Sequence, residues 1–149
     1  MALNVVCFIS VLLTAVIMAS GFAHLLSLPN KMALSRDEYL IVQQIYRGWA
    51  LLGIAFFGAL LSTLALTVMV RASRRVFYLT LTATLCIGLS LVVFFLFTYP
   101  ANQQTLNWTM SPENWQELRR QWEYSHAVGA GLSFAALMAL VLGLLIERA

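Results

Sequence analysis

The sequence predicts an all-α integral membrane protein, a bundle of four transmembrane helices that run up-down-up-down. Hydrophobic residues make up 61% of the 149 residues and charged residues only 10%, well below the roughly 25% charged residues of soluble domains. Four long stretches carry no charge, and each is long enough for the roughly 20 residues that cross a bilayer as a helix. None shows the apolar/polar alternation of a membrane β-barrel strand. We therefore expect one domain over residues 1–149.

The four spans are expected at about residues 4–28, 48–70, 76–98 and 124–146. The first stretch contains "MASGFA", whose small residues suit a signal-peptide cleavage point. However, no Lys or Arg precedes its apolar run, and that run is too long for a signal peptide, so we predict a span. The segments 29–47 and 99–123 should form a polar cap at one end, and "RASRR" a tight turn at the other.

Basic residues near the ends of spans orient a membrane protein. One end of the predicted bundle carries Arg71, Arg74, Arg75 and Arg148, and the other carries Lys31, Arg36, Arg47, Arg119 and Arg120. The count alone does not decide, but the second group shares its segments with acidic residues that can pair with it. We therefore place the "RASRR" turn and both termini in the cytoplasm of an inner or plasma membrane.

Two histidines are expected to share a site. His24 lies near the end of the first span and His126 near the start of the fourth, so both fall on the same side at similar depth. Arg119, Trp122, Glu123 and His126 follow at i, i+3, i+4 and i+7, which places them on one helix face. Ionisable groups at membrane depth are costly and by default indicate function, but a His near the interface can also hydrogen-bond a backbone carbonyl or water as a neutral ring.

The charged neighbours of this face each allow two interpretations. Glu123 could orient His126 or accept its ring proton. A carboxylate hydrogen-bonded to a histidine in this way fixes the tautomer of the imidazole for proton transfer or metal binding. Glu123 could equally pair with Arg119 one turn away. Arg47 opens the second span on the same side and serves either as an interface anchor or as a partner for an anionic oxygen.

The segment "TYPANQQTLNW", which leaves the third span on this side, is polar but uncharged. Its amides Asn102, Gln103, Gln104 and Asn107 can both donate and accept hydrogen bonds. A segment of this kind can satisfy a buried polar ligand without the cost of desolvating a net charge. We predict that it forms a lid over the site.

Three motifs in the same order and spacing, "GFAHLLSLPNK", "YPANQQTLNW" and "WEYSHA", resemble the anthrone oxygenase-like family of small four-span membrane proteins, over nearly the whole chain. The resemblance implies oxidation of a polyphenolic anthrone to a quinone with dioxygen. The positions that match the family pattern are His24, Asn102, Trp122 and His126. Relatives carry a basic residue shortly after the last histidine, where this chain has "HAVGAG".

The favoured mechanism needs no cofactor. His24 or His126 acts as general base on a hydrophobic phenolic substrate, and Asn102 with Arg47 stabilises the developing oxyanion. The side chains expected to bind the substrate are Arg47, Trp122, Glu123, Gln103 and Asn107.

Two alternatives stay open. His24 and His126 could ligate a metal or a haem between the first and fourth spans, although two histidines fall short of a closed zinc site. The chain could also be a non-enzymatic membrane subunit or a module that binds hydrophobic molecules, packed against a membrane partner or a second copy.

Other function classes lack their residues. The chain has no phosphate-binding glycine loop, no Ser-His-Asp pattern and no zinc-protease motif. Despite the formal charge of +3, no soluble basic surface for nucleic acid can be seen.

Overall fold

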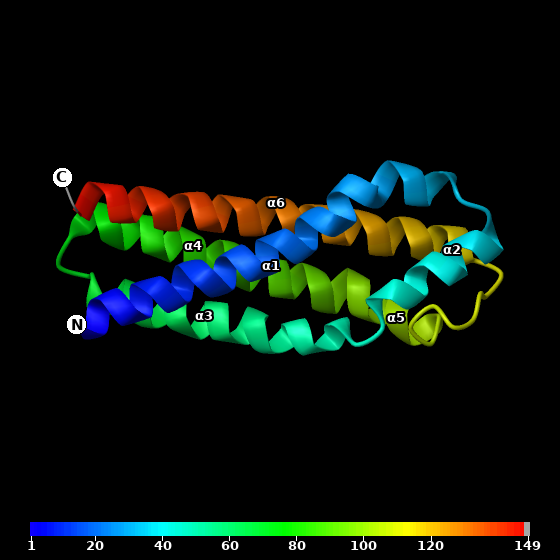
Figure 1. The fold of residues 1–149 in the computed structure, drawn as a ribbon, viewed down its shortest axis with the longest axis horizontal. Helices are drawn as coiled ribbons and strands as arrows, with labels where there is room; N and C mark the ends of the chain where they lie inside the picture. Colours follow the sequence, from blue (N-terminus) through cyan, green and yellow to red (C-terminus); the bar gives the residue numbers. More distant parts are fainter. Residues whose placement is uncertain (148–149) are drawn as a thin grey trace.

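The structure, a computed structural model, describes residues 1–147, and no strand occurs in that range (Figure 1). Four segments are long and apolar enough to span a membrane: Ala2–Ala33, Trp49–Met69, Arg74–Gln104 and Trp115–Ile146. The predictions of an all-helical chain and of four long apolar helices are therefore confirmed. Arg148, used above to orient the chain, lies outside the described residues.

The long helices lie side by side as a bundle, and consecutive ones run in opposite directions in Figure 1. They are α1 (Ala2–Ala33), α3 (Leu52–Met69), α4 (Arg74–Val93) and α6 (Trp115–Glu147). Helix α1 packs on α3 and α6, and α4 packs on the same two helices. Both termini lie at the end that holds the turn between α3 and α4. The opposite end, called the cap, holds α2 (Arg36–Gln43) and α5 (Tyr99–Gln104).

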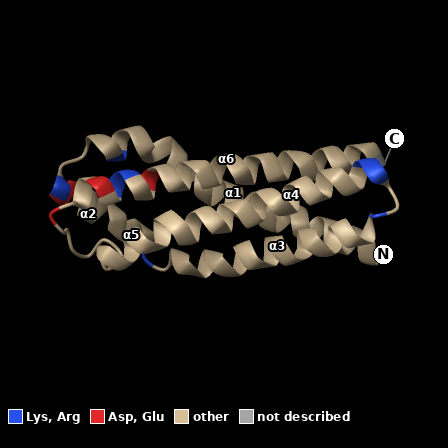
Figure 2. Ribbon diagram, turned by 180° about the vertical axis from the view of Figure 1, so that it is seen from behind, with Lys and Arg blue, Asp and Glu red and all other residues tan. Residues whose placement is uncertain are grey.

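The sides of the bundle are apolar, and its interior combines an apolar core with small hydroxyl residues. Large apolar side chains such as Phe8, Leu61 and Leu85 are exposed on its sides. Small hydroxyl residues are buried inside it, and many bond to carbonyls of their own helix, as Thr63 does to Ala59 at 2.8 Å. Charged residues gather at the two ends, and the sides are free of them in Figure 2.

The helices of the cap end extend further than the predicted spans. Helix α1 continues through Pro29 to Ala33, and α6 begins at Trp115, well before residue 124. Hydropathy marks only the apolar part of a helix. The polar segment "WQELRRQWE" is rich in residues that favour helices, so α6 extends through it beyond the apolar span. The segments predicted to form the polar cap are therefore largely helical.

The end of α4 is also different from the prediction. The chain does not leave the helix near residue 98 but widens into a π-helical turn, η3 (Phe94–Thr98), and continues as α5 through Pro100. A proline has no N–H to give to the preceding turn, and a wider turn accommodates it. The Gln121 side chain of α6 donates to the Phe97 carbonyl at 2.8 Å and so satisfies a backbone acceptor there.

Helices α1 and α6 approach closely where both carry small residues. A Cβ added to Gly21 would lie 3.0 Å from the Ala130 Cα, so only glycine fits without displacement. Gly129, one residue before, faces the Ser90 hydroxyl of α4. These contacts set the width of the bundle below the cap.

Candidate functional site

A cavity of about 710 Å³ lies between the helices in the half of the bundle next to the cap. This volume is in the range that holds a drug-sized ligand. All four long helices contribute to its wall, together with the segment 102–109. Phe57 of α3 and Phe95 of η3 line the cavity and are each 50% exposed, so they form part of both the cavity wall and the accessible surface.

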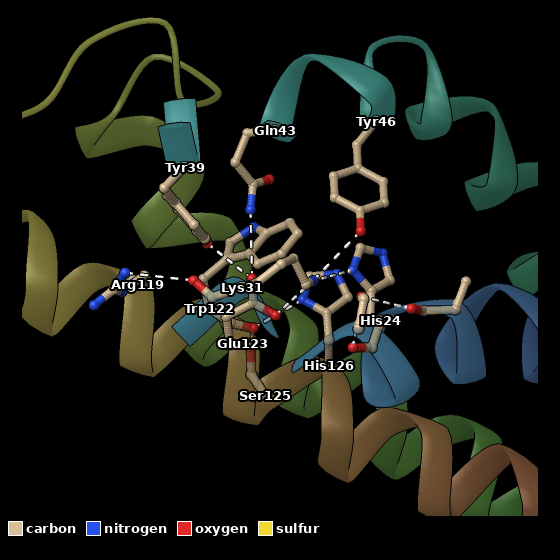
Figure 3. A network of polar contacts seen from close by, with 12 residues as sticks. His24, Lys31, Tyr39, Gln43, Tyr46, Arg119, Trp122, Glu123, Ser125 and His126 are labelled. Carbon is tan, nitrogen blue, oxygen red and sulfur yellow. Dashed lines mark hydrogen bonds and ion pairs between the residues drawn. The ribbon is translucent and has the colours of Figure 1, made fainter. Parts of the chain in front are cut away.

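The two predicted histidines meet in this cavity (Figure 3). The ring centroids of His24 and His126 are 4.1 Å apart, with the planes tilted by 34°. Tyr46 packs against the His24 ring at 4.3 Å, and Trp122 against the His126 ring at 4.1 Å. The two imidazoles therefore stack on each other and are surrounded by aromatic side chains. Trp49, which also lines the cavity, contacts the His24 ring edge-on.

Hydrogen-bond partners assign opposite tautomers to the two rings. His126 Nδ1 lies 2.8 Å from the Trp122 carbonyl oxygen, which can only accept, so Nδ1 carries the proton and Nε2 the lone pair. His24 Nδ1 lies 3.5 Å from the Lys31 ammonium, which can only donate, so here Nδ1 carries the lone pair and Nε2 the proton. The neutral pair thus offers one basic nitrogen and one N–H donor.

Behind His24 lies a buried ion pair. Lys31 and Glu123 are 3% and 0% exposed, and their charged atoms are 2.6 Å apart. The ammonium also reaches His24 and, at 3.4 Å, the Tyr46 hydroxyl, so three acceptors surround its three N–H groups. Burying two charges is favourable only when the pair is well supported by further partners.

Helix α2 supplies that support. The Tyr39 hydroxyl donates to Glu123 Oε1 at 3.0 Å, and Gln43 Nε2 does so at 3.4 Å. Tyr39 is itself fully buried, and desolvation together with the nearby Glu123 carboxylate raises the pKa of its phenol. Tyr39 therefore remains a hydrogen-bond donor to Glu123. The capping box that starts α2, in which Glu38 accepts from Ser35, fixes this helix over the ion pair.

Neither interpretation of Glu123 offered above describes the structure, because its ion-pair partner is Lys31. Arg119 instead donates to the Leu34 carbonyl at 2.9 Å and stacks on Trp115, with 4.6 Å between the guanidinium and the ring centre. His126 bonds to the Trp122 carbonyl. Glu123 does not line the cavity, so it acts on the site through its partners Lys31 and Gln43, of which Gln43 lines the cavity.

The amide-rich segment does cover the site, but part of it is helix α5. Asn102 accepts a hydrogen bond from Trp122 Nε1 at 2.7 Å and lines the cavity, as does Asn107. Gln103 is exposed and is not part of the cavity wall, so its predicted role in substrate binding has no support in the geometry.

After α5 the chain turns through three consecutive left-handed residues, Leu106, Asn107 and Trp108, with φ of 47°, 56° and 60°. Such a conformation costs roughly 1–2 kcal/mol for each non-glycine residue. The turn carries Trp108, which is 2% exposed, into the cavity wall and edge-on to Tyr39 at 4.9 Å. Two features favour the turn, namely the burial of this indole and the hydrogen bond that the Trp108 N–H donates to Thr105 Oγ1 at 3.1 Å, whereas the indole Nε1 has no partner among residues 1–147.

Arg47 lies at the rim of the cavity. Its side chain is exposed and donates to Gln44 Oε1 at 2.9 Å, next to the left-handed Gly48 that begins the turn into α3. Both roles considered for Arg47 are compatible with this place.

The residues present fit a metal or a haem poorly. Among residues 1–147, no group of three or more His, Cys, Asp or Glu side chains could hold a metal ion. The stacked imidazoles leave no space for a porphyrin plane between them. The Lys31 ammonium, directed at His24, also disfavours a second cation at that ring.

Four site residues were not predicted from the sequence, namely Lys31, Tyr39, Gln43 and Tyr46. Only Lys31 left a readable signal, because it follows His24 by seven residues and thus lies two helical turns away on the same face. The other three lie beyond the first span. No local sequence pattern there indicates how that segment packs against the bundle.

No protein-family model, no curated protein and no solved structure matches this chain.

Proposed function

We propose that the chain is an integral membrane protein whose four long helices cross a lipid bilayer. The apolar sides of the bundle and the confinement of charge to its ends support this assignment. In this proposal the termini and the turn between α3 and α4 face the cytoplasm of an inner or plasma membrane. The cap and the ion pair then lie at the opposite face, with the histidines at its edge.

The proposed function is oxidation of a hydrophobic phenolic molecule by dioxygen within the cavity, as the anthrone oxygenase-like resemblance implies. The observation that carries it is the stacked pair of imidazoles, with a base at one ring and an N–H donor at the other, in an aromatic cavity of ligand size. A planar aromatic substrate suits such walls, because rings favour stacked and edge-on contacts.

The chemistry starts with proton removal. His126 Nε2 takes a proton from a methylene carbon between two aromatic rings, and His24 Nε2–H with the Asn102 amide stabilises the oxyanion into which the charge spreads. The carbanion attacks dioxygen and forms a C–O bond. The O–O bond of this peroxide then breaks as the second hydrogen leaves the carbon, so that the products are a ketone and water. One oxygen atom of O₂ is in each product, and O₂ takes up all the electrons that the substrate loses.

The test is oxygen uptake by the detergent-purified protein with an anthrone, above the rate in empty micelles. His126→Ala should lower the rate about 100-fold or more, the typical contribution of a positioned general base. Asn102→Ala should also slow it strongly, whereas Gln103→Ala, the neighbouring amide outside the cavity, should leave it unchanged.

Three outcomes contradict this proposal in different ways. A wild-type rate equal to that of empty micelles would remove the oxidation and favour a subunit or a module that only binds hydrophobic molecules. Equal rates for wild type and His126→Ala would remove the base. A histidine-dependent absorption band or stoichiometric metal in the purified protein would replace the cofactor-free mechanism.

A further inference from the structure

The serines within the helices of this chain divide into two groups. In the larger group the hydroxyl donates to a carbonyl three or four residues earlier, which is the usual way to satisfy a serine inside a helix. Its members are Ser10, Ser20, Ser27, Ser62 and Ser125. The other two, Ser90 and Ser133, have no hydrogen-bond partner among residues 1–147.

Both exceptional serines line the cavity and are almost fully buried, with exposed fractions of 3% for Ser90 and 1% for Ser133. Neither hydroxyl oxygen is fully enclosed by protein atoms, so each can form a hydrogen bond with a molecule in the cavity. Every other helical serine hydroxyl is already bonded to its own helix. The two hydroxyls are therefore free to bind whatever occupies the cavity.

The two serines come from facing helices and lie at the deep end of the cavity. Ser90 of α4 faces Gly129 of α6, where an added Cβ would lie 3.2 Å from the serine oxygen. Ser133 lies one turn further along α6 and two turns beyond His126, which is roughly 10 Å along the helix axis. The cavity wall also includes the apolar side chains of Ile17 and Phe56.

We propose that Ser90 and Ser133 form a second polar subsite, which binds a hydroxyl or carbonyl oxygen at the far end of the ligand. The ligand class is a rigid, mostly apolar polycycle about 10 Å long with an oxygen function at each end, one near the histidines and one at the serines. Because serine both donates and accepts, the subsite takes either oxygen type. This inference rests on the proposed binding of a phenolic ligand in the cavity and specifies its shape.

The experiment measures binding and not turnover. The probes are a dihydroxyanthraquinone with hydroxyls at opposite ends of its long axis and the analogue that lacks one of them, since quinones of the product type do not consume oxygen. Quenching of tryptophan fluorescence reports dissociation constants for the detergent-purified wild type, Ser90→Ala, Ser133→Ala and the double variant. Ser62→Ala is the matched control, because it removes a helical serine hydroxyl outside the cavity.

The wild type and Ser62→Ala should bind the dihydroxy probe about 3- to 10-fold more tightly than the monohydroxy probe, as one additional hydrogen bond predicts. The preference should shrink in each single variant and vanish in the double variant. A preference that persists in the double variant, an equal loss for both probes, or no binding of either probe to the wild type would each overturn the subsite. Selective binding without oxygen uptake would remove the oxidation and leave the subsite standing.

Discussion

Removal of the buried cation should destabilise the protein far more than removal of a similar cation at the surface. Lys31→Met leaves the Glu123 carboxylate, which is 0% exposed, without the ammonium now 2.6 Å away. Tyr39 and Gln43 still donate to the other oxygen, but neither carries a compensating charge. Loss of one partner from a buried pair typically costs about 3–5 kcal/mol, and we expect a loss of this size in the free energy of unfolding.

A second variant separates the orphaned charge from lost packing. In Lys31→Met/Glu123→Gln both charges are gone, and the amide oxygen can still accept from Tyr39. Because neutral replacement of a buried pair often costs little, the double variant should recover more than half of the stability lost in Lys31→Met. Arg36→Met is the control, since the Arg36–Asp37 pair is exposed and worth at most about 1 kcal/mol.

Unfolding by titration with a denaturing detergent, followed by tryptophan fluorescence, gives the free energies for the wild type and the three variants. The reasoning is refuted if the double variant is as unstable as Lys31→Met, because the cost would then not come from the unpaired carboxylate. A loss for Arg36→Met equal to that for Lys31→Met would refute the role of burial.

Two further predictions concern the framework around the site. Gly21→Ala places a Cβ 3.0 Å from the Ala130 Cα and should lower the free energy of unfolding by about 1–3 kcal/mol. In the control Gly131→Ala the added Cβ meets nothing within 4 Å, so the free energy of unfolding should not fall. Equal unfolding curves for the two variants would contradict this difference. The hydrogen bonds from Ser35 hold the pKa of Glu38 below its usual 4.5, so the capping box stabilises the fold above that pH and this contribution is lost as the pH falls through the lower folded value. Glu38→Gln should therefore flatten the acid limb of a melting-temperature profile, and identical limbs would disprove the effect.

The sequence was sufficient for the four helices and for the meeting of the two histidines. An uncharged run of about 20 residues has few alternatives to a helix in an apolar chain. An even number of crossings then returns His24 and His126 to the same end, and the structure places their rings in contact. Both inferences use only length and connectivity, which a single sequence contains.

The ion-pair partner could not be predicted in the same way. Arg119 and Lys31 were both available to Glu123, and Arg119 lies one turn away on the same helix. The choice depends on how α1 and α6 pack and on the carbonyls that attract Arg119 instead, which are tertiary facts. The left-handed turn at Leu106–Trp108 was hidden for a similar reason, because Leu and Trp do not favour that conformation and the burial of Trp108 is a tertiary fact.

The half-exposed rings of Phe57 and Phe95 in the cavity wall bear on which ligand concentration governs binding. In the proposed membrane arrangement, a ligand that enters past these rings arrives from the apolar phase around the protein and not from water. Its occupancy then follows its mole fraction in that phase, so a poorly soluble molecule can saturate the cavity while its aqueous concentration stays negligible. For the same reason, additional detergent dilutes the ligand and weakens its apparent binding without any change in the protein.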